Sequence, residues 1–140
     1  MASTTLPEIY RPMMEGVTVK AGRCLVCGRV WPLNEHHAVW RSWGEVIDEK
    51  GKRAKKPTLT LCGDGNNLWG LAPDGTRVQW CHGKAHHRLL HFRWVPAIPY
   101  GSEQERKVYP AKIGGHWEYL ETEEPTKYQD ALALDGWRPL

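Results

Sequence analysis

Cysteine and histidine side chains are concentrated in one segment of this chain. Residues 24–91 contain all four cysteines and six of the seven histidines. The cysteines occur as a Cys-x2-Cys pair and two later single residues. Because four thiolates can saturate one tetrahedral zinc ion, the pattern predicts a structural zinc site made of Cys24, Cys27, Cys62 and Cys81. The alternative is four reduced thiols, two of them buried as small apolar side chains.

The histidines predict a second metal site with open coordination positions. His82 and His86 are four residues apart, a spacing that places both side chains on one face of a helix. His36 or His37 can supply a third ligand from a strand. Neighbouring residues of a strand point to opposite faces, so one of the two can bind the ion while the other acts as a base near neutral pH. A second structural zinc or a histidine-rich surface are the alternatives.

Short elements must position these side chains. Residues 58–62 have the β-branched alternation of a strand, and residues 29–40 are predicted to pair with it in a hairpin. A helix is expected from about His82 to Phe92. On that helix His87 and His91 have the same i, i+4 spacing, so they are the alternative metal-binding pair.

The rest of the chain predicts an α+β fold with an appended segment. Residues 117–120 are expected to form a strand and residues 126–134 a helix. We therefore expect an extended arm at residues 1–21, a compact core at residues 22–95, and an acidic C-terminal extension at residues 96–140, packed on or beside the core.

Charge and composition favour a polyanionic partner. The 140-residue chain has a net charge of +3, yet residues 23–94 carry 12 basic side chains against 6 acidic ones. This surplus coincides with the cysteine and histidine segment, as expected if a nucleic acid binds there. Lys55 and Lys56 in a polar loop, together with Arg88, are candidate phosphate contacts; a merely solvated surface is the alternative.

Compartment and membrane association follow from what the sequence lacks. We expect no signal peptide in residues 1–12, because no apolar stretch follows a basic one, and the apolar runs are too short to span a bilayer. The expected location is therefore the cytoplasm, where cysteines serve as metal ligands rather than disulfides.

The order of these motifs resembles that of the HNH endonucleases of phage and prophage genomes. The resemblance covers about half of the chain, from Cys24 to Phe92. It rests on the four motifs Cys24-x2-Cys27, His36-His37 followed by Arg41-Ser42-x-Gly44, Leu61-Cys62-Gly63 and Cys81-His82-x3-His86. Family members have a ββα-metal core, a hairpin followed by a helix, and hydrolyse DNA with one divalent ion.

The resemblance implies a role for each matching residue. His37 would be the general base, and His36, His82 and His86 would hold the catalytic ion, which could be Mg²⁺, Mn²⁺, Ni²⁺ or Zn²⁺. The four cysteines would hold the structural Zn²⁺, and Arg41 would contact a phosphate of the DNA.

The sequence departs from the family pattern at its asparagine. The position that usually holds this residue is Pro57, so Thr58, Asn66 or Asn67 would have to substitute for it. The implied partner is double-stranded DNA in a bacterial host cell. The alternative functions are a catalytically silent zinc module that binds nucleic acid or a protein, and an accessory nuclease of a phage packaging machine acting beside the terminase.

Overall fold

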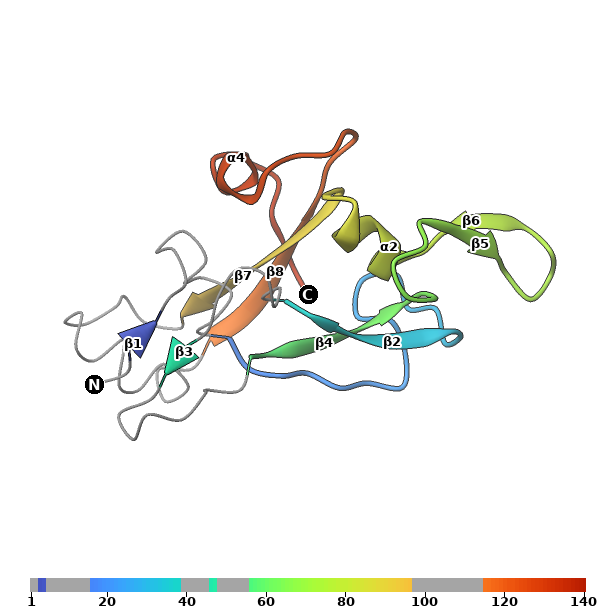
Figure 1. Cartoon of the computed structure of the whole chain (residues 1–140), viewed down its shortest axis with the longest axis horizontal. Helices are drawn as coiled ribbons and strands as arrows, with labels where there is room; N and C mark the ends of the chain where they lie inside the picture. Colours follow the sequence, from blue (N-terminus) through green and yellow to red (C-terminus); the bar gives the residue numbers. More distant parts are fainter. Residues whose placement is uncertain (1–2, 5–15, 39–45, 48–55, 97–114) are drawn as a thin grey trace.

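A computed structural model of the chain describes residues 3–4, 16–38, 46–47, 56–96 and 115–140 (Figure 1). In chain order its elements are β1 (Ser3–Thr4), β2 (Leu33–His37), β3 (Val46–Ile47), β4 (Thr58–Cys62), β5 (Trp69–Leu71), β6 (Arg77–Gln79), α2 (Cys81–His86), β7 (Leu90–Pro96), β8 (Gly115–Glu121), α4 (Tyr128–Leu132) and β9 (Arg138–Pro139). Within these ranges the strands pair as β1–β3, β2–β4, β5–β6 and β7–β8–β9. The fold is α+β, as the sequence predicts.

Strands β2 and β4 pair antiparallel, as predicted. Their register places His36 opposite Leu59 and His37 opposite Thr58. All of β4 is buried. The chain around Val19 runs along its second edge, where the Val19 N–H donates to the Thr58 carbonyl at 3.0 Å. Strand β2 begins at Leu33 rather than at the predicted residue 29. Pro32 has no N–H to contribute to a strand ladder, which is consistent with this later start.

Helix α2 is shorter than the sequence predicts. It ends at His86 instead of continuing to Phe92, and Arg88 adopts a positive φ of 62° in the turn that follows. From Leu90 the chain is a strand. Leu90, Phe92 and Trp94 are buried on one of its faces, and His91 on the other face is buried as well. The long-range pairing of β7 with β8 therefore replaces the helical continuation that the local spacing suggests.

The C-terminal segment shares a sheet with the core. Strand β8 pairs along the length of β7 and places Trp117 opposite Trp94. The centroids of the two indole rings are 5.7 Å apart in an edge-to-face arrangement. The Tyr128 hydroxyl, on α4, donates to the Phe92 carbonyl at 2.7 Å. The predicted strand and helix of this segment are both present, the strand longer and the helix shorter than expected.

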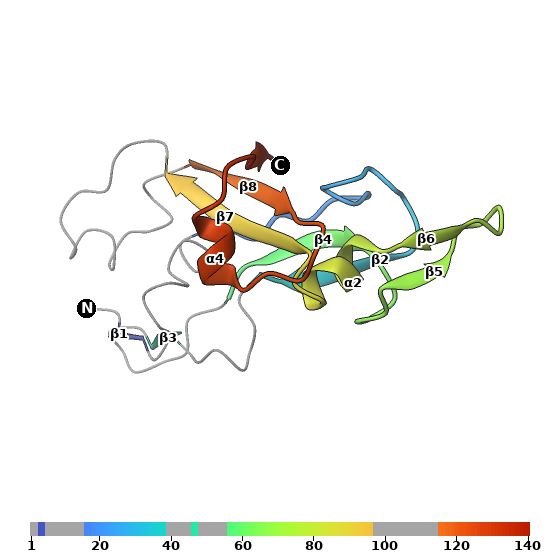
Figure 2. The ribbon, with the colours of Figure 1, turned by 90° about the horizontal axis from the view of Figure 1, so that it is seen from above.

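The main hydrophobic core combines sulfur and aromatic side chains. Cys24, Cys62 and Cys81 are buried in the same cluster as Leu59 and Phe92. Figure 2 shows α2 lying across the β2–β4 pair, beside β7. The hairpin β5–β6 extends from one end of the molecule (Figure 1). None of the described helices is both long and apolar enough for a membrane span.

Candidate metal centres

The four cysteine sulfurs converge on one point from three separate elements. Cys24 and Cys27 lie in a turn before β2, Cys62 ends β4, and Cys81 begins α2. The four Sγ atoms lie within 4.8 Å of one another, and those of Cys27 and Cys62 are 3.6 Å apart. Tetrahedral zinc with Zn–S bonds of about 2.3 Å requires sulfurs about 3.8 Å apart. The geometry fits a structural metal such as zinc.

The turn that carries the first two cysteines depends on Gly28. The Gly28 N–H donates to the Cys24 carbonyl at 2.9 Å, and the Cys24 N–H donates to the Arg29 carbonyl at 2.8 Å. Gly28 has a φ of +80°, a conformation that side chains with a Cβ rarely adopt. The chain thereby reverses tightly enough to present both sulfurs to the same side.

The cysteine thiols shift one another's pKa values through hydrogen bonds. Hydrogen bonds from Cys62 and Cys81 lower the pKa of the Cys24 thiol. The hydrogen bond with Cys24 raises the pKa of Cys62 to about 12. Hydrogen bonds with Cys24 and Cys62, and then burial, raise the pKa of Cys81. Four close thiolates repel one another, so a cation is needed for all of them to ionise together.

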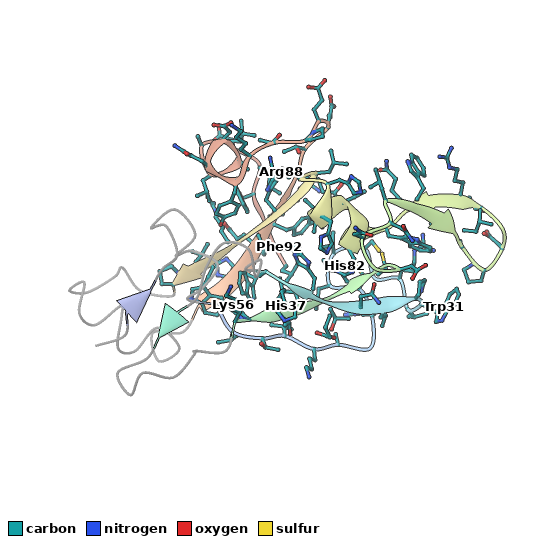
Figure 3. All side chains as sticks on the ribbon, viewed as in Figure 1. Trp31, His37, Lys56, His82, Arg88 and Phe92 are labelled. Carbon is teal, nitrogen blue, oxygen red and sulfur yellow. The ribbon has the colours of Figure 1, made fainter. Side chains whose placement is uncertain are left out.

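A second group of ligand atoms comes from three histidines. His36 on β2 and His82 and His86 on α2 each offer a ring nitrogen, and the three nitrogens lie within 4.8 Å of one another. The Nε2 atoms of His82 and His86 are 3.1 Å apart, and the ring centroids of His36 and His82 are 5.1 Å apart. Figure 3 places His82 between α2 and the β2–β4 pair. The structure thus brings together His82, His86 and His36. The sequence pattern leaves His36 and His37 as alternatives for the third ligand, and the family resemblance implies His36.

These rings are held in the neutral form that binds metals. Burial lowers the pKa of His36 well below its ordinary value of 6.5, and the neighbouring His82 lowers it further. Burial also lowers the pKa of His82 to about 4 and that of His86 below its ordinary value. The Nδ1 atom of His36 is buried without a hydrogen-bond partner. A buried nitrogen of this kind, among three neutral imidazoles, fits a metal ion.

Asn34 is a contact of this cluster that the sequence analysis missed. Its Oδ1 lies 3.0 Å from Nδ1 of His82 and accepts the Gly65 N–H at 2.9 Å. A sequence signal was available, because Asn34 precedes His36 by two residues and strand alternation puts both on one face of β2.

His37 lies outside the ligand cluster and is exposed. Strand alternation points its side chain to the face opposite that of His36. Its charge is nevertheless among the causes that lower the pKa values of both His36 and His82. The ring of His37 is therefore within electrostatic range of the cluster.

The three suggested substitutes for the family asparagine have other hydrogen bonds or contacts. Thr58 is opposite His37 in the register, but its hydroxyl donates to Glu35 at 3.4 Å. The backbone carbonyl of Asn66 accepts a hydrogen bond from the His87 ring at 3.2 Å. The backbone carbonyl of Asn67 lies against Gly83 of α2. The structure gives none of these three described residues a hydrogen bond to His37.

The candidate phosphate contacts are only partly described. Arg88 is exposed and Lys56 is half-buried, while Arg41 and Lys55 lie outside the described residues. The alternative metal pair of His87 and His91 is wrong, because His91 belongs to β7 rather than to the helix and its Nε2 donates to the Arg88 carbonyl at 2.9 Å.

Comparison of the chain with protein-family models, with curated proteins and with solved structures gives no match. The assignment of function therefore depends on the two groups of ligand atoms.

Proposed function

We propose that this chain is a metal-dependent endonuclease of the HNH type that nicks or cuts duplex DNA. The observation that carries the proposal is the cluster of His36, His82 and His86, with the exposed His37 next to His36 on β2. The order of the cysteine and histidine motifs supports the same assignment. A separate thiolate site leaves these imidazoles available for chemistry rather than for structural binding.

Three imidazoles would hold the ion of the active centre. Nitrogen ligands suit Zn²⁺ and Ni²⁺, whereas Mg²⁺ prefers carboxylate and other oxygen ligands. The ligand cluster among the described residues contains no carboxylate. When bound, a divalent cation stabilises the charge that develops on the phosphate and on the leaving 3′-oxygen.

His37 would act as the general base. Its ring accepts a proton from the attacking water, while His36, its neighbour on the strand, faces the opposite side and belongs to the ligand set. The hydrolysis forms a bond from the water oxygen to phosphorus and breaks the bond from phosphorus to the 3′-oxygen. The 3′-oxygen takes a proton from solvent, which leaves 5′-phosphate and 3′-hydroxyl ends. The exposed guanidinium of Arg88, with Lys56, Lys55 and Arg41, would hold the DNA backbone.

The thiolate site would position the histidines of this centre. Cys62 ends β4 and Cys81 immediately precedes His82. An ion bound to both sulfurs ties the first turn of α2 to the strand that pairs with β2. This cross-link would orient α2 so that the ring of His82 faces His36.

The proposal is tested by the conversion of supercoiled plasmid to open circle. Protein that carries zinc only at the cysteines is incubated with plasmid and no added metal, or with Mg²⁺, Mn²⁺, Ni²⁺ or Zn²⁺ added in turn. We expect metal-dependent nicking, faster with Ni²⁺ or Zn²⁺ than with Mg²⁺. His37→Ala should lower the nicking rate by roughly 10²- to 10⁴-fold, as is typical for loss of a general base, with zinc content and DNA affinity retained.

His116→Ala is the matched control, because His116 is an exposed histidine on β8 outside the ligand cluster. It should nick as fast as the unaltered protein. Equal nicking by His37→Ala would rule out the role of that residue. DNA binding without cleavage under every metal would identify the chain as a silent zinc module instead.

A further inference from the structure

The side-chain amide of Asn34 has a determined orientation. Its Nδ2 donates to the Leu33 carbonyl at 3.0 Å, and a carbonyl oxygen can only accept. Its Oδ1 accepts the N–H of Gly65 at 2.9 Å, and a backbone N–H can only donate. Both contacts require the same orientation of the amide, so the atom that faces His82 is an oxygen.

An oxygen at this position determines the tautomer of His82. The contact from Asn34 Oδ1 to His82 Nδ1 is 3.0 Å long, and the amide oxygen has no proton to give. In the metal-binding form of the ring, which carries a single proton, that proton must therefore be on Nδ1. Nε2 then carries a lone pair and faces Nε2 of His86 at 3.1 Å.

We propose that Asn34 is a positioning residue of the histidine cluster, which fixes His82 as the Nδ1–H tautomer and aims its Nε2 lone pair at a bound transition-metal ion. This inference deepens the proposed function, on which its catalytic relevance rests. Ligating histidines commonly donate their second N–H to such a partner, which orients the ring and raises the basicity of the ligand atom.

The neighbouring glycine makes the contact possible. A Cβ added to Gly63 would lie 2.6 Å from Cβ of His82 and 3.4 Å from Oδ1 of Asn34. The strand end and the helix can therefore approach only because residue 63 has no side chain. Asn34 thus joins three segments, namely β2, the loop at Gly65 and α2, around the ring of one ligand.

The tautomers of the ligand-free cluster follow directly. If Nε2 of His82 has the lone pair, the 3.1 Å contact requires His86 to donate from its own Nε2. In protein that carries zinc only at the cysteines, long-range ¹H–¹⁵N NMR should therefore find His82 protonated on Nδ1 and His86 on Nε2. A His82 ring protonated on Nε2 would overturn the proposal whether or not the protein cleaves DNA.

Two substitutions test the role in metal binding. Asn34→Leu removes the acceptor at similar volume and should weaken Ni²⁺ binding to the zinc-loaded protein by roughly 10- to 100-fold, as measured by calorimetry. Asn34→Asp keeps an acceptor toward both Gly65 and His82, and should bind Ni²⁺ at least as tightly as the unaltered protein. Unchanged Ni²⁺ affinity in Asn34→Leu would contradict the proposal, as would an equal loss in Asn34→Asp. If Asn34→Leu fails to fold, the aspartate variant and the NMR measurement on the unaltered protein still decide.

Discussion

Residue chemistry separates the two candidate centres. Sulfur ligands form a closed set of four, three of them in the core, and such a site resists exchange and stabilises structure. The imidazole set has three members, one short of the four that complete a tetrahedral site. A fourth position would remain for water or a phosphate oxygen, which is the arrangement of catalytic rather than structural zinc.

His91 predicts a pH dependence of stability that is separate from the metal centres. Its ring is buried, donates to the Arg88 carbonyl, and lies 6.2 Å from the ring of Tyr128. Burial lowers its pKa from the ordinary 6.5, the Arg88 carbonyl opposes this shift, and the charge of Arg88 adds to it. The unfolded chain therefore takes up a proton first, and stability present above pH 6.5 is lost as the pH falls toward the folded pKa.

The measurement compares urea unfolding at pH 7.5 and pH 5.5. His91→Gln keeps a donor toward Arg88 and does not titrate, so it should lose less stability on acidification than the unaltered protein. His116→Gln, at an exposed position, should lose as much as the unaltered protein. Acid release of zinc affects all three proteins and cancels in the comparison. Identical pH dependence of His91→Gln and the unaltered protein would exclude the effect.

At the scale of elements, α2 depends on a close approach to the loop before β5. A Cβ added to Gly83 would lie 2.0 Å from the Asn67 carbonyl oxygen and 2.6 Å from Cα of Leu68. These are backbone atoms, which cannot rotate away as a side chain could. The helix that carries His82 and His86 can therefore reach its position only with glycine at residue 83.

Gly83→Ala should consequently destabilise the protein. Overpacking of this kind typically costs about 1–3 kcal/mol, and the gain in helix propensity of about 1 kcal/mol offsets only part of it. Gly22→Ala is the matched control, because a Cβ there meets nothing within 4 Å. Chemical denaturation should show a lower free energy of unfolding for Gly83→Ala alone. Equal values for the two variants would disprove the close approach.

Local pattern predicts some elements and not others. The alternation of Thr58 to Cys62 predicts β4 with its observed bounds, because a short strand of β-branched and apolar residues is encoded locally. The end of α2 is not encoded in this way. Leu90 and Phe92 fit a helical or a strand period, and the choice depends on pairing with β8, which begins at residue 115.

The site was predictable only where residue type restricts the chemistry. Thiols and imidazoles have few roles at such spacing, so the sequence could group the four cysteines and the pair His82 and His86 that converge in the structure. The choice of His36 over His37 as the third ligand comes from the family resemblance. Asparagine has many roles. The contact of Asn34 with His82 joins residues 48 apart in the chain. Strand alternation places Asn34 on the same face of β2 as His36, but it does not specify that the amide reaches His82.

At the scale of the whole molecule, the metal and the core are expected to be one stabilising unit. Cys24, Cys62 and Cys81 are each at most 4% exposed and pack with the aromatic core, in a chain with 8 Trp and 1 Phe. Removal of an ion from this position leaves several buried thiols to share few protons and breaks the link between β4 and α2. The two centres should therefore respond differently to ligand loss.

Removal of the thiolate-bound metal should unfold the protein, whereas loss of the histidine site should not. Structural zinc contributes about 10–16 kcal/mol in zinc-finger peptides, comparable to the whole stability of a small domain, about 5–15 kcal/mol. Chelation, or Cys81→Ser, should therefore abolish the cooperative thermal transition seen by near-ultraviolet circular dichroism, and added Zn²⁺ should restore it only in the chelated native protein. His86→Ala, one turn along the same helix, should retain one bound zinc and a melting temperature within a few degrees. An unchanged transition after complete zinc removal would show that the aromatic core stands without the ion.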